Sequence, residues 1–319
     1  MAKTLAEYVA WLDERKDLLW AQAPPIQPLK ATPSIKPLAD IRVITLNPYG
    51  TLLHVDHGQL FHLHPQQLRT QIALEKTIKE FNMWNSMSRK PGQPWEYMLQ
   101  QYTKLLEERQ MSGTKRKGDT PAIDSSKIWL KILERLEKNE YVYDSVTLGD
   151  LEALSVKVAY FFHASMQGVA ASPHACEILT TIILSGRHVG LLGDGQPFTL
   201  VQILRALKQQ AAVHSLNEVL SSDSVFLSSD WGVRQPSPSL YEQARERFAA
   251  QGIQPHEVLH VSHQLKDDLG PARKVGFRTA LYAADKTACQ VSREELQDPE
   301  LRPDRLLTEF RQLRDLLML

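Results

Sequence analysis

Several polar and ionisable side chains of the 319-residue chain lie in the segments that follow short apolar runs. They are Asn47, Tyr49, Asp194, Arg234, Gln235, His263, Asp267 and Asp268. Carboxylate, amide and imidazole groups bind small ligands and metal ions, and carboxyl and imidazole groups also transfer protons. We therefore predict that these side chains form one ligand site, provided that the fold brings the segments together.

A second group of possible metal ligands follows the first of these segments. It consists of His54, Asp56, His57, His62 and His64. Imidazole together with carboxylate is a common ligand set for Zn²⁺, but the spacing fits no standard zinc site. We expect a His-rich polar loop. The alternative is that His54 or His57 approaches His263 and forms a metal-binding or pH-sensitive site, with Asp268 as a further candidate ligand.

Alternating strands and helices are predicted to position the polar residues. A β-branched, apolar segment at 41–46 predicts the first strand. Further strands are predicted at 188–192, 224–227, 258–261 and 279–282, with helical patterns between them. This alternation indicates an α/β fold with a doubly wound parallel sheet covered by helices on both faces. In such folds, ligand sites lie at the carboxyl ends of the strands.

A helical block interrupts this sheet after its first strand. Residues 59–168 carry long helical patterns and predict an inserted α-helical cap, which leaves 39–58 and 169–319 for the α/β core. Residues 1–38 predict a helix followed by a proline-rich strap, because proline lacks the N–H that helices and sheets use. The apolar stripe of that helix packs on its own domain, or it binds a second copy or another protein. A last helix is expected over 303–317.

Composition excludes several classes of partner. The 37 basic and 37 acidic residues cancel, so no overall field attracts nucleic acid, and the triad Lys115, Arg116 and Lys117 is expected to be a solvated loop. No apolar run reaches the roughly 18 residues that a membrane span requires. Cys176 and Cys289 show neither paired nor metal-ligand spacing, which favours a reducing compartment. We expect a cytoplasmic protein that binds neither nucleic acid nor a membrane.

Four motifs carry a resemblance to a known superfamily. Asn47-Pro48-Tyr49-Gly50-Thr51-Leu52 resembles the Asp-x-Asp-Gly-Thr-Leu signature of the haloacid dehalogenase (HAD)-like hydrolases. The other three motifs are Gly193-Asp194-Gly195, the Gly-x-x-x-Pro-x-Pro segment at 232–238, and the segment at 262–268 with the glycines that follow it. Their order and spacing agree over 41–282. The resemblance implies a Rossmannoid core, and the insertion resembles the cap of the helical-cap branch.

The same resemblance implies that the catalytic motifs are degenerate. The positions equivalent to the family's catalytic residues are Asn47, Tyr49, Gly193, Gln235, His263 and Asp268. The family has a nucleophilic Asp where Asn47 stands, and the neutral amide of Asn47 cannot attack phosphorus. The family has a Lys where this chain has Gln235, and a residue with a hydroxyl group where this chain has Gly193. Asp268 alone would hold hydrated Mg²⁺ only weakly.

Two functions follow from these substitutions. The first is a catalytically inactive HAD-like protein that uses the inherited scaffold for binding or assembly, with no cofactor expected. The second is an active, phosphatase-like hydrolase with rewired catalytic residues, for example with His263 or a His-containing metal site, and in that case Mg²⁺ would be needed. In both, the ligand is expected between the cap and the core.

Overall fold

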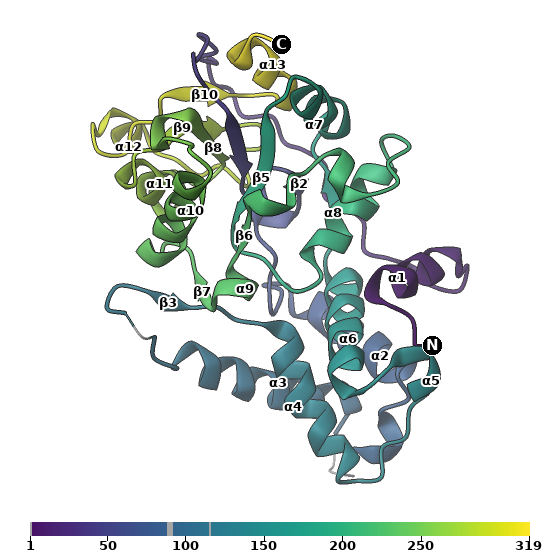
Figure 1. Cartoon of the computed structure of the whole chain (residues 1–319). Coiled ribbons are helices and arrows are strands. Elements are labelled where there is room, and N and C mark those ends of the chain that lie inside the picture. The colour runs from purple at the N-terminus through teal and green to yellow at the C-terminus, as the bar shows by residue number, and fades with distance from the viewer. Residues whose placement is uncertain (1, 88–91, 115) are drawn as a thin grey trace.

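Six parallel strands form the central sheet of the computed structural model, which describes residues 2–87, 92–114 and 116–319 (Figure 1). Lys115, part of the predicted basic loop, lies outside the described residues. The strands are β1 (Val43–Leu46), β5 (His188–Gly193), β6 (Val225–Leu227), β8 (Val258–Ser262), β9 (Arg278–Tyr282) and β10 (Arg305–Leu307). Their order is β10-β9-β8-β1-β5-β6, so the chain starts in the centre and its direction of winding reverses there. Leu46 aligns with Leu191 of β5 and Val261 of β8, and the three central strands therefore end side by side.

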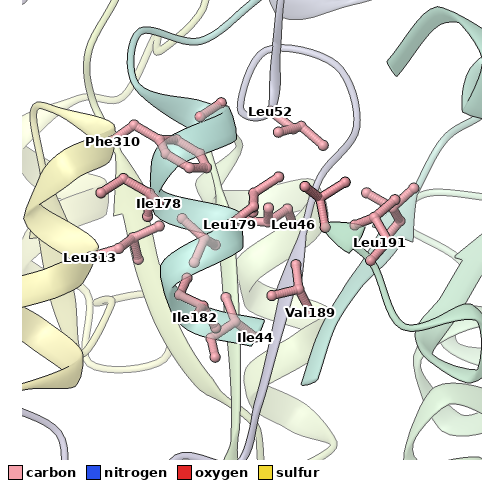
Figure 2. Packing of buried hydrophobic residues seen from close by; sticks show 14 of the residues in the cluster. Ile44, Leu46, Leu52, Ile178, Leu179, Ile182, Val189, Leu191, Phe310 and Leu313 are labelled. Carbon is pink, nitrogen blue, oxygen red and sulfur yellow. The ribbon is translucent and has the colours of Figure 1, made fainter. Parts of the chain in front are cut away.

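Helices cover both faces of this sheet. One face packs against α7 (Ala175–Leu184), α8 (Thr199–Lys208) and α13 (Leu313–Leu317). Ile44 and Leu46 of β1 point to that face because side chains alternate along a strand, and Figure 2 shows them beside Ile182 and Leu179 of α7. The opposite face packs against α10 (Pro238–Ala250) and α11 (Gly270–Lys274). The predicted α/β fold with a doubly wound parallel sheet is confirmed.

The predicted cap region forms a helical layer beside the sheet (Figure 1). Its helices are α2 (Gln67–Glu80), α3 (Pro94–Gln110), α4 (Ser125–Glu137), α5 (Ser145–Leu148) and α6 (Leu151–Met166). They share a core in which Tyr102, Trp129 and Phe162 pack ring against ring. The layer is inserted between β2 (Leu53–His54) and β4 (Ala170–Ala171), which pair antiparallel where the chain leaves and re-enters the core.

A short two-stranded sheet joins the cap to the core at the lower left of Figure 1. In it, β3 (Thr120–Pro121) of the cap pairs antiparallel with β7 (Val233–Arg234) of the core, just after α9 (Ser228–Trp231). Ser237 Oγ accepts a hydrogen bond from the N–H of Thr120, and Asp119 accepts hydrogen bonds from the N–H and hydroxyl of Ser239. We call the residues 116–122, together with their partners on β7 and α10, the cap latch. Arg116, which pairs with Glu242, completes it.

The N-terminal helix packs on its own chain. Helix α1 (Leu5–Glu14) begins with a capping box between Thr4 and Glu7, and it buries Tyr8, Val9 and Leu12 in the core of the cap. The helix ends at Glu14, so the apolar residues Leu18 and Leu19 lie beyond it. The chain then runs over the core as an extended strap, in which Ser34 exchanges backbone hydrogen bonds with Leu306.

The end of the chain differs from the sequence-based prediction. The helix predicted at 303–317 is wrong, because residues 305–307 form the edge strand β10, and α13 begins only at Leu313. Pairing with β9 holds residues 305–307 in an extended conformation. A short helix, α12 (Arg293–Gln297), precedes this strand.

Among the described residues, no helix combines the length and the apolar character needed to cross a bilayer.

Candidate functional site

A cleft of about 320 Å³ lies between the carboxyl ends of the central strands and the cap. The core contributes Asn47 after β1, Asp194 after β5, and Gln235 after β7. The linker that leads into the cap contributes residues 58–63, and the cap adds Leu106 and Ile123. The structure thus brings several of the sequence-predicted polar residues together at the predicted edge of the sheet.

The amide of Asn47 holds the floor of this cleft together. Its Nδ2 donates hydrogen bonds to Oδ2 of Asp268 (2.7 Å) and to Oε1 of Gln235 (3.2 Å). Gln235 in turn donates to the hydroxyl of Tyr241, which donates to Oδ1 of Asp268 at 2.7 Å. The four side chains form a closed ring of hydrogen bonds, in which each donor has a partner.

A histidine below the floor pairs with Asp268. His260 Nε2 lies 2.8 Å from Oδ1 of Asp268, and neither side chain is exposed to solvent. His260 Nδ1 contacts the hydroxyl of Thr45. Burial alone would raise the pKa of Asp268, but the charge and hydrogen bond of His260, with hydrogen bonds from Ser262 and Asn47, hold that pKa below its ordinary value.

The sequence analysis missed both His260 and Tyr241. His260 interrupts an otherwise apolar strand, and a polar residue at a buried strand position is a signal that it has a partner. Tyr241 comes from α10, and only the fold places it against the strand-end loops.

These residues do not fit Mg²⁺, the metal that the resemblance implies for an active enzyme. Mg²⁺ requires oxygen ligands, usually carboxylates. Here both carboxylate oxygens of Asp268 already accept hydrogen bonds, and the atom of Asn47 that faces it is a nitrogen donor. Among the described residues, no three His, Cys, Asp or Glu side chains are grouped closely enough to hold a metal.

Tyr49 and Gly193 also differ in chemistry from the catalytic residues that the resemblance implies at their positions. The hydroxyl of Tyr49 donates to Gln202 of α8 at 2.6 Å and contacts Thr199, and burial raises its pKa above the ordinary tyrosine value. Tyr49 therefore anchors the loop to α8 and is a poor proton donor. Gly193 has φ +149°, and a Cβ there would lie 3.1 Å from the Pro48 ring. A serine or threonine at this position would be strained.

Asp194 and Arg234 give the cleft its charged groups. Asp194 Oδ1 accepts the N–H of Gln235 at 2.9 Å. Burial raises the pKa of Asp194 to about 6, although this hydrogen bond and the charge of Arg234 oppose the shift. The side chain of Arg234 lines the cleft but is exposed overall. Asp267 is exposed and lies on the outer side, in a neighbouring groove.

The ring of His263 is wedged between two glycines. It is 2% exposed, and a Cβ on Gly50 or Gly58 would lie 2.6 Å from a ring nitrogen. Both glycines have positive φ, so this close approach depends on residues without a side chain. Burial lowers the pKa of His263 to about 4, and it is a neutral packing residue at physiological pH.

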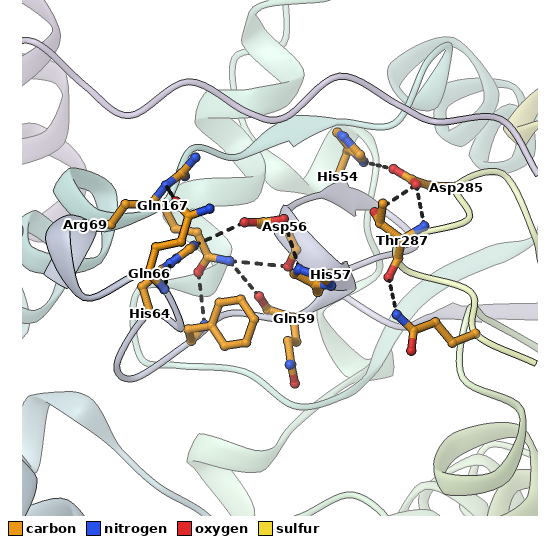
Figure 3. A network of polar contacts seen from close by, with 12 residues as sticks. His54, Asp56, His57, Gln59, His64, Gln66, Arg69, Gln167, Asp285 and Thr287 are labelled. Carbon is orange, nitrogen blue, oxygen red and sulfur yellow. Dashed lines mark hydrogen bonds and ion pairs between the residues drawn. The ribbon is translucent and has the colours of Figure 1, made fainter.

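The His-rich segment does not converge on one point (Figure 3). His54 Nε2 contacts the Pro24 carbonyl oxygen of the strap and its Nδ1 lies 3.6 Å from Asp285, whereas His64 pairs with Asp56 at 3.1 Å. His57 is half-exposed. Figure 3 also shows Gln167, which donates to the Gln59 carbonyl and accepts the Phe61 N–H, so that it ties the two linkers of the cap together.

His62 is the member of this segment that reaches the cleft. It lines the cavity and lies against His163, with ring centroids 5.8 Å apart. Its buried Nδ1 has no hydrogen-bond partner among the described residues. Burial, aided by the charge of Arg234, lowers the pKa of His62 to about 4.

Comparisons with known proteins agree with this architecture. A family model described as HAD-hydrolase-like matches residues 232–313. No curated protein sequence matches the chain.

Solved structures of dehalogenases and hydrolases are similar over most of the chain. The 2-haloacid dehalogenase from Pseudomonas syringae pv. Tomato DC3000 is 16% identical, with a TM-score of 0.50 over 86% of this chain and 97% of that chain. A dehalogenase solved with an intermediate complex is 21% identical, with a TM-score of 0.47 over 88% of this chain and 98% of that one. The putative HAD-hydrolase YfnB from Bacillus subtilis is 15% identical, with a TM-score of 0.45 over 88% and 99%. At such identities the similarity concerns the fold. The chain therefore has a fold similar to that of the HAD-like hydrolases, and a HAD-hydrolase-like family model matches its C-terminal part.

Proposed function

We propose that this chain is a non-catalytic HAD-like protein that uses its cleft for binding. The observation that carries the proposal is the hydrogen bond from Asn47 to Asp268. The atom at the position of the family's nucleophile is a donor, so it cannot attack an electrophilic phosphorus or carbon. The remaining carboxylate, that of Asp268, is paired from below with His260 and is engaged in the floor of the cleft.

The links between cap and core support the same proposal. In enzymes whose site lies under a cap, motion of the cap admits substrate and excludes water. Here the cap latch ties the cap to β7 and α10. Beside the cleft, Gln196 of the core accepts the Ser125 N–H at the start of α4 and donates to the Ile123 carbonyl. A third link runs from Arg205 of α8 to Asp13 of α1 and the hydroxyl of Tyr160.

An active hydrolase with rewired residues is the second candidate. Asp194 favours it, because a carboxyl group with a pKa of about 6 suits general acid–base catalysis. His263 does not supply the missing nucleophile, since its neutral ring is enclosed by Gly50 and Gly58. A covalent mechanism therefore has no nucleophile at Asn47 or at His263.

A substrate screen distinguishes the two candidates. The full chain is assayed with phosphate monoesters, a phosphonate and 2-haloacids, each with Mg²⁺, Mn²⁺ or Zn²⁺, beside an Asn47→Ala variant. We expect both proteins to show the same background rate. Turnover by the unmodified protein that Asn47→Ala abolishes would overturn the proposal, and turnover that Asp194→Asn abolishes would favour the second candidate.

Assembly is the other role that we propose for the N-terminal segment. Although α1 buries its apolar stripe, Trp11 is 37% exposed and Leu19 is 81% exposed. Light scattering of the full chain tests this, with Trp11→Ser and Leu19→Ser variants beside it. A mass of one chain for the unmodified protein would argue against a homodimer.

For location we propose the cytoplasm, because Cys176 and Cys289 are free and buried.

A further inference from the structure

The cleft contains many hydrogen-bonding groups and little free charge. Its lining includes the carboxamides of Asn47, Gln59, Gln110, Gln196, Gln235 and Gln264. Among the described lining residues, the groups charged at neutral pH are Asp194 and Arg234, which have opposite signs. A site for a phosphorylated ligand would instead concentrate positive charge, a metal ion or a helix N-terminus around the anion.

Part of this hydrogen-bonding capacity is unused. The side chains of Gln59, Gln110 and Gln264 make no hydrogen bond with other described residues. A carboxamide presents both a donor and an acceptor, and so do hydroxyl groups and the edges of heterocycles. These side chains can therefore recognise an uncharged polar ligand by reciprocal hydrogen bonds.

The imidazole of His62 adds an unsatisfied group on the cap side. Its Nδ1 is buried without a partner, and such groups in native proteins call for a ligand, a water or a functional reason. Because burial keeps the ring neutral, His62 offers one donor and one acceptor and adds no attraction for an anion.

The remaining wall is apolar. Leu60, Phe61, Leu63, Leu106 and Ile123 line the cavity, and all but Leu106 and Ile123 come from the linker into the cap. An apolar wall opposite polar side chains suits a ring whose face is apolar and whose edge carries donors and acceptors.

We propose that the cleft binds an uncharged ring-shaped ligand bearing hydroxyl or amide groups, of the sugar or nucleoside kind, and discriminates against its phosphorylated form. Asn47 and Gln235 form the floor for this ligand, Gln264 and His62 flank it, and Phe61 covers its apolar face. A phosphate placed against Asp194 would be repelled by that carboxylate, and the floor offers it no cation. This inference rests on the proposed non-catalytic function, because a catalytic site would have to bind the phosphate ester itself.

Matched pairs of ligands test the inference on the full chain. Ligand-observed NMR compares glucose with glucose 6-phosphate, and adenosine with adenosine monophosphate. We expect one uncharged member to bind and its phosphorylated partner to bind at least about tenfold more weakly. We expect His62→Phe and Gln264→Ala each to lower the affinity about tenfold, the effect of one lost hydrogen bond in a dry site.

His256→Phe is the matched control, since His256 is exposed and precedes β8, at the end of the strand opposite the cleft. Because Gln264→Ala alters a partly exposed side chain, it keeps the test valid if His62→Phe misfolds. Tighter binding of the phosphorylated members, no binding of any member, or affinities that both cleft variants leave unchanged would overturn the inference. Phosphorus NMR on the same samples detects ester hydrolysis, which would instead overturn the non-catalytic function, so the two failures are distinguishable.

Discussion

The side-chain nitrogen of Asn47 donates a 2.7 Å hydrogen bond to Oδ2 of Asp268. Both residues are buried, at 3% and 0% exposure. An amide and a carboxylate attract each other at this distance, whereas two carboxylates in the same place would repel and would need a cation between them. Asn47 and Asp268 therefore form a pair that is stable without a metal, whereas two carboxylates at these positions would need one.

Asn47→Asp should destabilise the protein at neutral pH. It replaces the donor with a second buried carboxylate beside Asp268, and we expect a loss of about 3 kcal/mol in the free energy of unfolding at pH 7.5. The pKa of the new carboxyl group is raised above its unfolded value, so the loss is full above that raised pKa and shrinks as the pH falls through it. Urea unfolding at pH 5 and pH 7.5 measures this. The exposed Asn217→Asp serves as the control, and equal effects of the two substitutions would contradict the assignment.

Magnesium should act on that variant and not on the unmodified chain. In Asn47→Asp two carboxylates face each other and provide oxygen ligands, whereas in the unmodified protein Asn47 presents a nitrogen donor. Millimolar Mg²⁺ should therefore raise the Tm of Asn47→Asp by a few degrees and leave the unmodified Tm unchanged. Thermal unfolding with and without EDTA provides the measurement. A Mg²⁺-dependent rise in the unmodified protein would show that its floor rearranges to hold the ion.

The sequence predicts the sheet well and its last strand poorly. Strands such as 188–192 and 258–261 are apolar runs between helical patterns, so local pattern and tertiary position agree. Arg305–Leu307 is three residues long and precedes a helix, and only pairing with β9 makes it a strand. The cap latch is equally hard to predict from the sequence. Thr120 and Pro121 are too few to show a periodic pattern, and their pairing with β7 spans more than 110 positions of the chain.

The candidate site is predictable where it depends on strand ends. Asn47 and Asp268 follow parallel neighbours, β1 and β8, so their proximity follows from topology. The orientation of the side chains does not follow from topology. Tyr49 turns toward α8, His263 turns toward two glycines, and His260 faces the site from within a strand. These outcomes depend on packing around each residue, which the sequence pattern does not encode.

His260→Gln should expose the electrostatic role of the buried pair. Glutamine retains an N–H donor for Asp268 but has no charge, and we expect a loss of about 2–4 kcal/mol at pH 7. The folded-state pKa of Asp268 is lowered, so its stabilising contribution is present above the unfolded pKa and is lost as the pH falls through the folded value. The difference between the two proteins should narrow in acid, as measured by chemical unfolding at several pH values. His256→Gln, at an exposed position, should change nothing.

Asp194→Asn should stabilise the protein above pH 6. The carboxylate of Asp194 is held in a buried place that raises its pKa to about 6, and asparagine keeps the oxygen that accepts the Gln235 N–H. A carboxyl group whose pKa is higher in the folded protein than in the unfolded chain destabilises the protein as the pH rises from the lower pKa to the higher one. The gain from Asp194→Asn should therefore reach on the order of 2 kcal/mol at pH 7.5 and vanish near pH 4. A gain that is independent of pH would exclude ionisation of Asp194 as its cause.

Asp119→Ala should loosen the cap latch without disturbing the sheet. Asp119 accepts two hydrogen bonds from Ser239, including one of 2.5 Å from its hydroxyl, and their loss should cost about 1–2 kcal/mol locally. Hydrogen exchange should accelerate roughly tenfold at the amides of Thr120, of Ala122, which donates to Gly232, and of β7, while β1 and β5 keep their protection. Mass spectrometry of peptides covering 116–124 and 228–240 measures this exchange. Asp223→Ala, which removes an exposed 3.8 Å ion pair with Arg247, is the matched control and should leave those peptides unchanged. If both variants exchange like the unmodified protein, the cap is held by Gln196 and α1, and the latch contributes little to its closure.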